Sequence, residues 1–441
     1  MTRWMVGLTV GNFEKMIDTL RLTVPGSYFD QPTLFWLQSL QSKILKTNYD
    51  GTFQRWCILS GIELPSWTEG FSLVVGNRVT IEASPKIYQG HNVDGPDDLM
   101  TAASNILHFI FGEVFGLTAN LWPSPRLWFV ARVDVTYSWD FGSFEALDVW
   151  MDTVSGVQRG RRRAGVEVRS EDDRDFSVDA VASGRTLYIG KGSRYRVGKI
   201  YAKSRDLLAH PPRCLRDFPD TLKEVARSLD PVGRFESQVR ALYLSRNAVK
   251  LGLVPAAYAG LDPVAYAESV KSYLVNECKF PETLHSTNKR QPIVYFPVQH
   301  LHNYLDLRSL WDSEFSHFFV KESVMNDTNL IKELFNVAPS AKQAQAAFNY
   351  LMLIRAQGLA YAKSTVAQRT HYHYRKLLLA AGLSDAALQD GAPLVKASLD
   401  PVKIREFRPD PVVLRVIEDA HKAMLPGVLD RLRAEVFKIA A

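Results

Sequence analysis

The chain has 441 residues, and 53 Lys and Arg against 47 Asp and Glu leave a net charge of +6. With 46% hydrophobic and 23% charged residues it is too apolar for a disordered chain, and its length suggests roughly two to four domains. Three cysteines lie far apart, which excludes a disulfide framework and a zinc ribbon, and no apolar stretch reaches the ~20 residues of a membrane helix. We therefore expect a protein of a reducing cytoplasm, without a signal peptide and without contact to a membrane.

The first half of the chain alternates predicted strands with predicted helices. The strands share an apolar alternation bounded by turn residues, and they cover 17–24, a hairpin over 70–84 that turns at Gly76, 127–139, 186–190, 197–203 and 234–241. The helices share a 3.6-residue apolar period, and they cover 32–46, 95–116, 144–154 and 221–229. This order predicts an α+β fold with a mostly antiparallel sheet and helices on one of its faces.

The second half changes to helical patterns beyond about Gly260, so we place a domain boundary there and expect a mainly helical domain over 261–441. Within it, 340–357 predicts a helix that Gly358 ends, and 370–381 predicts a shorter one. This pair over 340–382 is typical of a helix-turn-helix motif, whose second helix lies in the DNA major groove, and equally of two packed helices in a bundle. Residues 1–15 precede the first strand and are expected to be an N-terminal arm or an overlong start.

Positive charge is concentrated between Ser155 and Asp206, where thirteen Lys and Arg face seven Asp and Glu, an excess equal to that of the whole protein. Such clusters usually bind a phosphate backbone, although a solvated loop has the same composition. The acidic run 171–175 indicates a self-paired hairpin tip. The candidate DNA contacts are Arg161, Arg162, Arg163, Arg194, Arg196 and Lys199 in this window, with Arg234 and Arg240 in the strand that follows.

Three predicted strands each carry a polar row opposite a largely apolar one, because side chains alternate across a strand. Asp134 lies in the polar row of 129–139, and Glu236 lies in that of 234–241. In 197–203 the corresponding row holds Lys199, Tyr201 and Lys203. If these strands are neighbours, one face of the sheet collects two carboxylates, a tyrosine and several cations.

That set of side chains suits the cleavage of a phosphodiester. Asp134 and Glu236 can hold Mg²⁺ or Mn²⁺, which polarises a non-bridging phosphate oxygen. Tyr201 can attack as the phenolate, and Lys203, two residues along the strand, would favour its ionisation. The alternative is that the two acids pair with the arginines two residues before them on a solvated sheet. Tyr188 and Tyr195 lie in the same segment and remain candidates for a share of the reaction.

Histidines offer competing sites. His91 lies in the Gly-bounded turn QGHNVDG and is a candidate metal or phosphate ligand, although a lone loop histidine is more often neither. His371 and His373 lie in a predicted helix, where residues i and i+2 point to nearly opposite sides and cannot chelate together. His300 and His302 follow an extended run and could share a strand face. There is no Walker loop, so helicase activity would come from a partner.

Five segments carry a resemblance to a known family. They are MIDTLRLTVP (16–25), IEASPKIYQGHNVDG (81–95), ARVDVTYS (131–138), GRTLYIGKGSRYRVGKIYAKSRDL (184–207) and RFESQVRALYL (234–244). In this order they are similar to the replication initiators of filamentous phages, the gene II protein type. The TLYIGKGS…IYAK pattern also resembles initiators of rolling-circle plasmids.

The resemblance implies that 16–260 is a nicking and joining domain and that Tyr201, the tyrosine of the Tyr-x-Lys element, is the nucleophile. It would cut one strand at the phage origin and keep the 5′-phosphate as a phosphotyrosine. The free 3′-hydroxyl would prime replication, and the junction would later be cut and rejoined. Asp134 and Glu236 fall where the family has acidic residues.

The implied partners are origin DNA, double- and single-stranded, and a host helicase and DNA polymerase, in the cytoplasm of a bacterial host. The alternative from another class is a DNA-binding regulator of the same phage that never cleaves. A tyrosine recombinase would need a helical tyrosine with an Arg-His-Arg set, which the sequence does not show.

Overall fold

The computed structural model describes residues 16–39, 42–47, 53–59, 71–91, 93, 95–154, 158–159, 162–168, 185–209, 211–215, 218–286, 292–315, 327–383, 388 and 405–440. The predicted N-terminal arm and Arg161 lie outside them. Arg162 and Arg163 lie in a described strand, but their side chains are outside the description. Among the described residues, no helix is both long enough and apolar enough to cross a bilayer.

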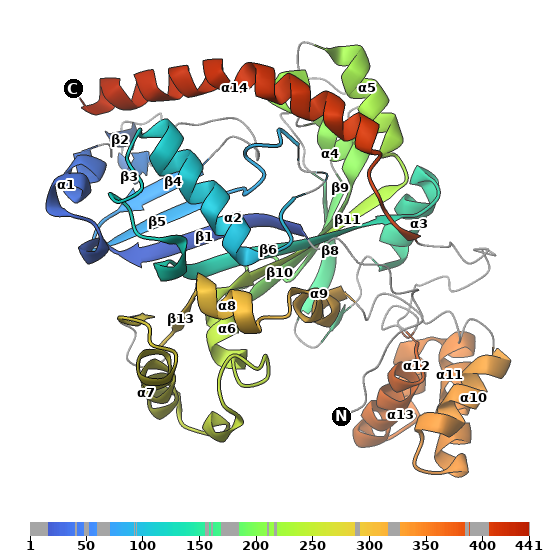
Figure 1. Ribbon diagram of the computed structural model, residues 1–441. Coiled ribbons are helices and arrows are strands. Elements are labelled where there is room, and N and C mark those ends of the chain that lie inside the picture. Colours follow the sequence, from blue (N-terminus) through green and yellow to red (C-terminus); the bar gives the residue numbers. More distant parts are fainter. Residues whose placement is uncertain are drawn as a thin grey trace.

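One large antiparallel sheet organises the molecule (Figure 1). Its strand order is β4-β5-β1-β6-β11-β10-β9-β8-β7, so strands distant in the sequence become neighbours at its centre. Their bounds are β1 Met16–Pro25, β4 Phe71–Val75, β5 Arg78–Ala83, β6 Phe129–Asp140, β7 Gln158–Arg159, β8 Arg162–Val168, β9 Arg185–Ile189, β10 Arg196–Ala202 and β11 Val232–Arg240. Short strands β13 (Val294–Pro297) and β14 (Arg405–Glu406) also pair with β6, and β12 (Leu284–His285) pairs with β13.

Helices cover the apolar face of this sheet, on the near side of Figure 1. They include α2 (Leu99–Leu107), which continues as a π-helix over His108–Val114, α8 (Val298–Tyr304) and α9 (Leu307–Phe315). Trp311 of α9 is buried against Tyr137 and Phe235, and its indole N–H donates to the Phe235 carbonyl at 3.1 Å. The predicted fold class, an antiparallel sheet with helices on one face, is confirmed.

The remaining elements of this half include a separate two-stranded sheet, β2-β3, and several helices. They are α1 (Gln31–Ser39), β2 (Ser42–Thr47), β3 (Phe53–Leu59), α3 (Phe144–Val154), α4 (Lys203–Ala209), α5 (Pro219–Ser228), α6 (Ala241–Asn247) and α7 (Pro263–Ser272). The helix predicted over 32–46 is wrong in its second half, because α1 ends at Ser39 and residues 42–47 pair with β3 as a strand.

The helical second half divides differently from the boundary predicted near Gly260. Val270 of α7, Phe296 of β13 and Trp311 of α9 belong to the same buried core as the sheet. A separate core, which includes Leu330, Leu351 and Leu378, holds together α10 (Asp327–Val337), α11 (Ala341–Gln357), α12 (Leu359–Ser364) and α13 (Gln368–Ala380). Helical periodicity predicted α11 and α13 among these elements but could not show which core each element joins.

The last helix, α14 (Pro411–Ala440), returns to the first core, where Val428 is buried (Figure 1). The two helices predicted over 340–357 and 370–381 are present as α11 and α13, with α12 between them. Ser340 caps α11, and Gly358 ends it with φ +85°, as its sequence predicted. The unit over 327–383 holds seven Lys and Arg and two Asp and Glu. Its role in DNA binding stays a prediction.

Candidate active site

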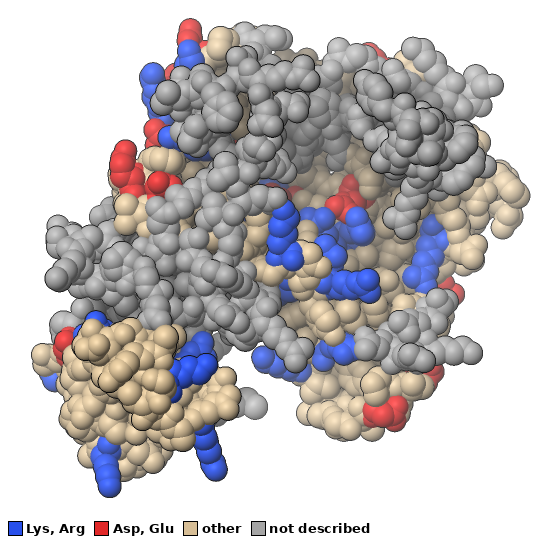
Figure 2. Space-filling model, turned by 180° about the vertical axis from the view of Figure 1, so that it is seen from behind, with Lys and Arg blue, Asp and Glu red and all other residues tan. Residues whose placement is uncertain are grey.

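The polar rows of β10, β11 and β6 form one continuous face. Tyr201 lies opposite Arg234, Lys199 lies opposite Glu236, and Gln238 of β11 lies opposite Asp134 of β6. Because directly opposed residues on paired strands share a face, the structure brings Tyr201, Glu236 and Asp134 to the same side of the sheet. Seen from behind, Lys and Arg side chains gather over the middle of the molecule (Figure 2).

Glu236 is the immediate partner of Tyr201. The tyrosine hydroxyl donates to Glu236 Oε1 at 2.5 Å, while Lys199 Nζ donates to Oε2 at 3.0 Å. Burial, followed by the negative charge of Glu236, raises the pKa of Tyr201 well above its usual 10, and Arg234 acts in the opposite direction. The phenol is therefore protonated in this arrangement, and the carboxylate is placed to accept its proton.

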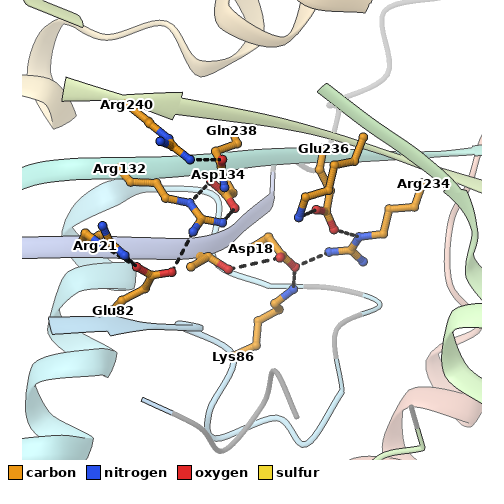
Figure 3. A network of polar contacts seen from close by, with 12 residues as sticks. Asp18, Arg21, Glu82, Lys86, Arg132, Asp134, Arg234, Glu236, Gln238 and Arg240 are labelled. Carbon is orange, nitrogen blue, oxygen red and sulfur yellow. Dashed lines mark hydrogen bonds and ion pairs between the residues drawn. The ribbon is translucent and has the colours of Figure 1, made fainter. Parts of the chain in front are cut away.

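A second carboxylate, Asp18 of β1, connects this pair to two buried cations (Figure 3). Arg234 Nη2 donates to Asp18 at 2.6 Å, and Lys86 Nζ donates to the same carboxylate oxygen. Arg234 Nε also lies 3.6 Å from Glu236 Oε1. Burial opposes the ionisation of Asp18, but Lys86 and Arg234 outweigh it and hold the pKa of Asp18 well below its usual range. Burial lowers the pKa of Lys86 to about 8.

Asp134 is held by an arginine rather than by the tyrosine. Arg132 donates through Nε to Asp134 Oδ1 at 2.8 Å and through Nη2 to the other oxygen, and its Nη1 donates to Glu82 at 2.7 Å. The pairing of Asp134 with Arg132, which the alternative interpretation of the sequence proposed, is therefore present. Burial raises the pKa of Asp134 against the opposing effect of Arg132.

The donor chemistry of the two predicted metal ligands suits a hard cation. Mg²⁺ is usually held by one or two carboxylates together with substrate phosphates, and Asp134 and Glu236 lie on the same face and affect each other electrostatically. Each carboxylate already carries a cation, Arg132 or Lys199, that a metal would have to displace. Within the described part of the chain, no three His, Cys, Asp or Glu side chains group as metal ligands.

Lys203 does not have the predicted relation to Tyr201. Strand β10 ends at Ala202, so Lys203 begins α4 and leaves the strand alternation on which the prediction rested. Its Nζ pairs with Asp206 at 3.0 Å and lies 6.0 Å from the centre of the Tyr201 ring. The cation that favours ionisation of the phenol is Arg234 instead.

Two of the predicted DNA contacts are buried structural residues. Arg196 points to the apolar side of β10, where it pairs with Glu314 at 2.9 Å and donates to Ser313 at 2.7 Å. Arg234 is fully buried between Asp18 and Glu236. Neither side chain is exposed to a DNA backbone in this arrangement. The physical reason is that a charge count does not distinguish a buried ion pair from an exposed cation.

The other described candidates lie where DNA can reach them. Lys199 is partly exposed on the polar face. A pocket of about 270 Å³ lies beyond the other end of β11, and Arg194 and Arg240 line it together with Arg21 and Tyr295. We refer to these four residues as the arginine pocket.

The histidines form no site with Asp134 and Glu236. His91 is fully buried, and its Nε2 lies 3.5 Å from Glu418 of α14. Burial lowers the pKa of His91 to about 3, so the ring is neutral. The strand predicted for His300 and His302 is wrong because both lie in helix α8, where His300 Nε2 bonds to the Leu253 carbonyl at 2.7 Å. His371 lies in α13 and bonds to Tyr350, in keeping with the helix predicted there.

The other two tyrosines of the segment occupy different positions. Tyr188 lies opposite Lys199 and thus on the polar face, where Lys191 stacks on its ring. Tyr195 lies before β10, next to Arg246. Of the three tyrosines, Tyr201 is the one whose hydroxyl donates to Glu236.

Asp18 and Lys86 are absent from the sequence-based site. Asp18 lies at a β-bulge between Ile17 and Thr19, and a bulge changes which face a residue presents without a clear sequence signal. Lys86 follows Pro85 in a turn after β5, where a lysine is ordinarily solvated. Both residues lie in segments that carry the family resemblance, 16–25 and 81–95, but each segment holds other charged residues as well.

We compared this chain with protein families, curated proteins and solved structures. A family model that describes the N-terminal part of the gene II type of replication-associated protein matches residues 16–252, which is more than half of the chain and includes Tyr201, Asp134 and Glu236. No curated protein matched. Among solved structures, a rolling circle replication initiator protein from Geobacillus stearothermophilus is 12% identical, covering 68% of this chain and 96% of that chain, with a TM-score of 0.25.

Proposed function

Because the chain belongs to the family of gene II type replication-associated proteins predicted from its sequence, we propose that it initiates rolling-circle replication by nicking and rejoining one strand at an origin. The observation that carries this proposal is the Tyr201 hydroxyl, placed on a cation-rich sheet face and hydrogen-bonded at 2.5 Å to the Glu236 carboxylate. A nucleophile within hydrogen-bonding reach of a base is the arrangement required for covalent catalysis.

In the nicking step, the Tyr201 oxygen attacks the phosphorus of the scissile phosphodiester while its proton passes to Glu236. A bond forms between the tyrosine oxygen and phosphorus, and the bond between phosphorus and the 3′-oxygen breaks. The 3′-oxygen takes up a proton from solvent and leaves as a hydroxyl, and the 5′-phosphate stays on Tyr201. In rejoining, a 3′-hydroxyl attacks the phosphorus and loses its proton to solvent. A bond forms between the 3′-oxygen and phosphorus, the bond between phosphorus and the tyrosine oxygen breaks, and Glu236 returns its proton to the tyrosine oxygen.

Two cations beside this pair stabilise the developing charge. Arg234 favours the phenolate, and Lys199, which bonds to Glu236, lies on the exposed side where a phosphate would approach. Asp134 and Glu236 would hold Mg²⁺ or Mn²⁺, which supplies polarisation of a non-bridging phosphate oxygen when bound. The basis of the metal proposal is the pair of carboxylates on one face.

The arginine pocket supports a path for the DNA strand. Arg240 lies six residues along β11 from Arg234, which is about 20 Å at the rise of a strand. Glu236 and Gln238 occupy the polar row between them. We propose that the strand lies along this row and that phosphates or a nucleotide occupy the pocket, where Tyr295 offers a ring for base stacking. The freed 3′-hydroxyl would then be available to a host polymerase, with a host helicase separating the strands.

The test uses the supercoiled circular replicon that encodes this chain. We expect the purified protein to produce nicked circles carrying a covalent protein adduct with Mg²⁺ or Mn²⁺, and none with EDTA. Tyr201→Phe is expected to bind DNA but form no adduct, while Tyr188→Phe and Tyr195→Phe serve as matched controls that retain it. Sequencing the trapped peptide identifies the nucleophile.

Binding without any adduct from the wild-type protein would instead support the DNA-binding regulator. An adduct formed normally by Tyr201→Phe would show that another residue attacks.

A further inference from the structure

The C-terminal helix α14 is built into the fold of the sheet half, although more than 300 residues separate it from β5. Ile417 is fully buried in a cluster with Val93, Leu207 and Leu215. One end of the helix lies near α5, and the helix then runs across the sheet half toward α1 (Figure 1). Near its other end, Arg433 Nε donates to the carbonyl of Glu113 at 2.8 Å. These contacts place α14 against the loop that follows β5.

His421 is the central contact between α14 and that loop. Its side chain is fully buried, and its Nε2 lies 2.9 Å from the carbonyl oxygen of Ile87. Burial lowers the pKa of His421, so the ring is neutral and Nε2–H is the donor. Gly90 faces the ring with φ +71°, and a Cβ atom at that position would come within 2.4 Å of His421. The loop therefore needs its glycine where the histidine packs.

The same loop delivers Lys86 to the active site. Lys86 directly precedes Ile87, and its carbonyl accepts from the Gln89 N–H at 2.9 Å in the turn that His421 supports. Its ammonium group reaches Asp18, which also binds Arg234. At the far end of the loop, His91 lies 3.5 Å from Glu418, one helical turn before His421. Two residues of α14 thus contact both ends of the segment that carries Lys86.

The consequence for Tyr201 follows from the sharing of Asp18. With Lys86 in place, Asp18 divides its interaction between two cations, and Arg234 also stays 3.6 Å from Glu236. Without Lys86, we expect Arg234, the other cation that is hydrogen-bonded to Asp18, to be drawn toward this carboxylate. The electrostatic effect by which Arg234 favours the phenolate would then be weaker, whereas the exposed arginines of the pocket would be unaffected.

We propose that α14 is a positioning element of the active site, in which His421 holds the loop over 85–91 so that Lys86 stays bound to Asp18. This inference rests on the proposed nicking activity. His421 and Lys86 act through Arg234 and do not touch the phosphate, so they are positioning residues. Their loss should slow the attack of Tyr201 while DNA affinity is retained.

The experiment uses full-length protein and an oligonucleotide spanning the nick mapped on the replicon. His421→Ala is expected to slow single-turnover adduct formation at least about tenfold, with oligonucleotide affinity unchanged within about twofold. His421→Gln, which retains an N–H donor, should recover part of the rate. Asp419→Ala is the matched control, because Asp419 lies on the same helix with 78% of its side chain exposed, and it should behave as the wild type.

A double-mutant cycle separates positioning from general destabilisation. If His421 acts through Lys86, the double variant His421→Ala with Lys86→Met should be no slower than Lys86→Met alone. Rate losses that multiply would overturn the proposal, and so would a folded His421→Ala protein with the wild-type rate. Should His421→Ala not fold by circular dichroism, His421→Phe replaces it, since the ring fills the space without the hydrogen bond.

The two proposals fail with different experimental results. If the proposed function is wrong, the wild-type protein forms no adduct. If this inference is wrong, the wild-type protein forms the adduct and the α14 substitutions have no effect.

Discussion

The two ends of the polar row on β11 differ in whether their charged side chains are buried in ion pairs or exposed. At the Tyr201 end each of these cations has a carboxylate partner: Lys86 and Arg234 pair with Asp18, and Lys199 pairs with Glu236. At the other end, three arginines line the arginine pocket, and of these Arg21 pairs with Glu82, while Arg194 and Arg240 lie at its surface. A buried charge is strongly destabilising without a partner, whereas an exposed arginine is not. We therefore expect DNA to meet most of the exposed positive charge at the arginine pocket, away from the nucleophile.

The strongest test of the Tyr201 end is to remove its proposed base, Glu236. Glu236→Gln keeps the size of the side chain but cannot accept the phenol proton, so we expect adduct formation to slow by about 10²- to 10⁴-fold. Oligonucleotide affinity should remain within a few-fold. Single-turnover assays and binding assays on the same oligonucleotide measure the two quantities separately.

Glu82→Gln is the control within the same network, because Glu82 binds Arg132 and Arg21, and Glu236 is the carboxylate that accepts from Tyr201. Since Arg21 lines the arginine pocket, the rates of both variants are compared at saturating oligonucleotide. The adduct rate of Glu82→Gln should fall by much less than that of Glu236→Gln. Equal effects of the two substitutions would mean that general charge balance, rather than proton transfer, explains the role of Glu236.

The comparison also shows what strand alternation can and cannot predict. A period of two placed Tyr201, Glu236 and Asp134 on one face, and the register of β10, β11 and β6 is consistent with that expectation. The same rule failed for Lys203, because it cannot show where a strand gives way to a helix. It was not applied to Arg196, an odd number of residues from Tyr201, which therefore points to the helices.

Long-range partners are a second limit on prediction. Asp18 reaches the site through a bulge, and Lys86 reaches it through a turn that His421 contacts from 334 positions away in the chain. None of these relations has a local pattern, since each depends on which elements pack together. Family resemblance identified the segments around Asp18 and Lys86 but assigned no role to either residue.

At the exposed end, Arg240→Gln should weaken DNA binding with little effect on the chemical step. Loss of one charged contact to a phosphate corresponds to roughly a tenfold loss of affinity. The slope of log affinity against log salt should also fall by about 0.7 for a single-stranded oligonucleotide. Fluorescence anisotropy over a salt series measures both effects.

An oligonucleotide design sharpens this prediction. The loss should appear only with oligonucleotides long enough to extend about 20 Å from the nick toward the pocket. Arg227→Gln, an exposed arginine on α5, serves as the control for removal of any surface charge. An equal loss for short oligonucleotides would contradict the proposed path of the strand.

The smallest expected effect concerns stability at the buried end. Burial lowers the pKa of Lys203 from 10.5 to about 8 against the attraction of Asp206. Because the folded state binds this proton less tightly than the unfolded state, the folded state is penalised below pH 8, and stability is regained as the pH rises from about 8 toward 10.5. Lys203→Met should lack that gain, a difference of at most a few kcal/mol between pH 7.5 and 10 in urea unfolding. Lys223→Met removes a lysine with the same i,i+3 spacing to an aspartate, and it should follow the wild-type pH dependence because its side chain is exposed. If both variants follow the wild-type pH dependence, the charges near Tyr201 are not desolvated as the structure has them.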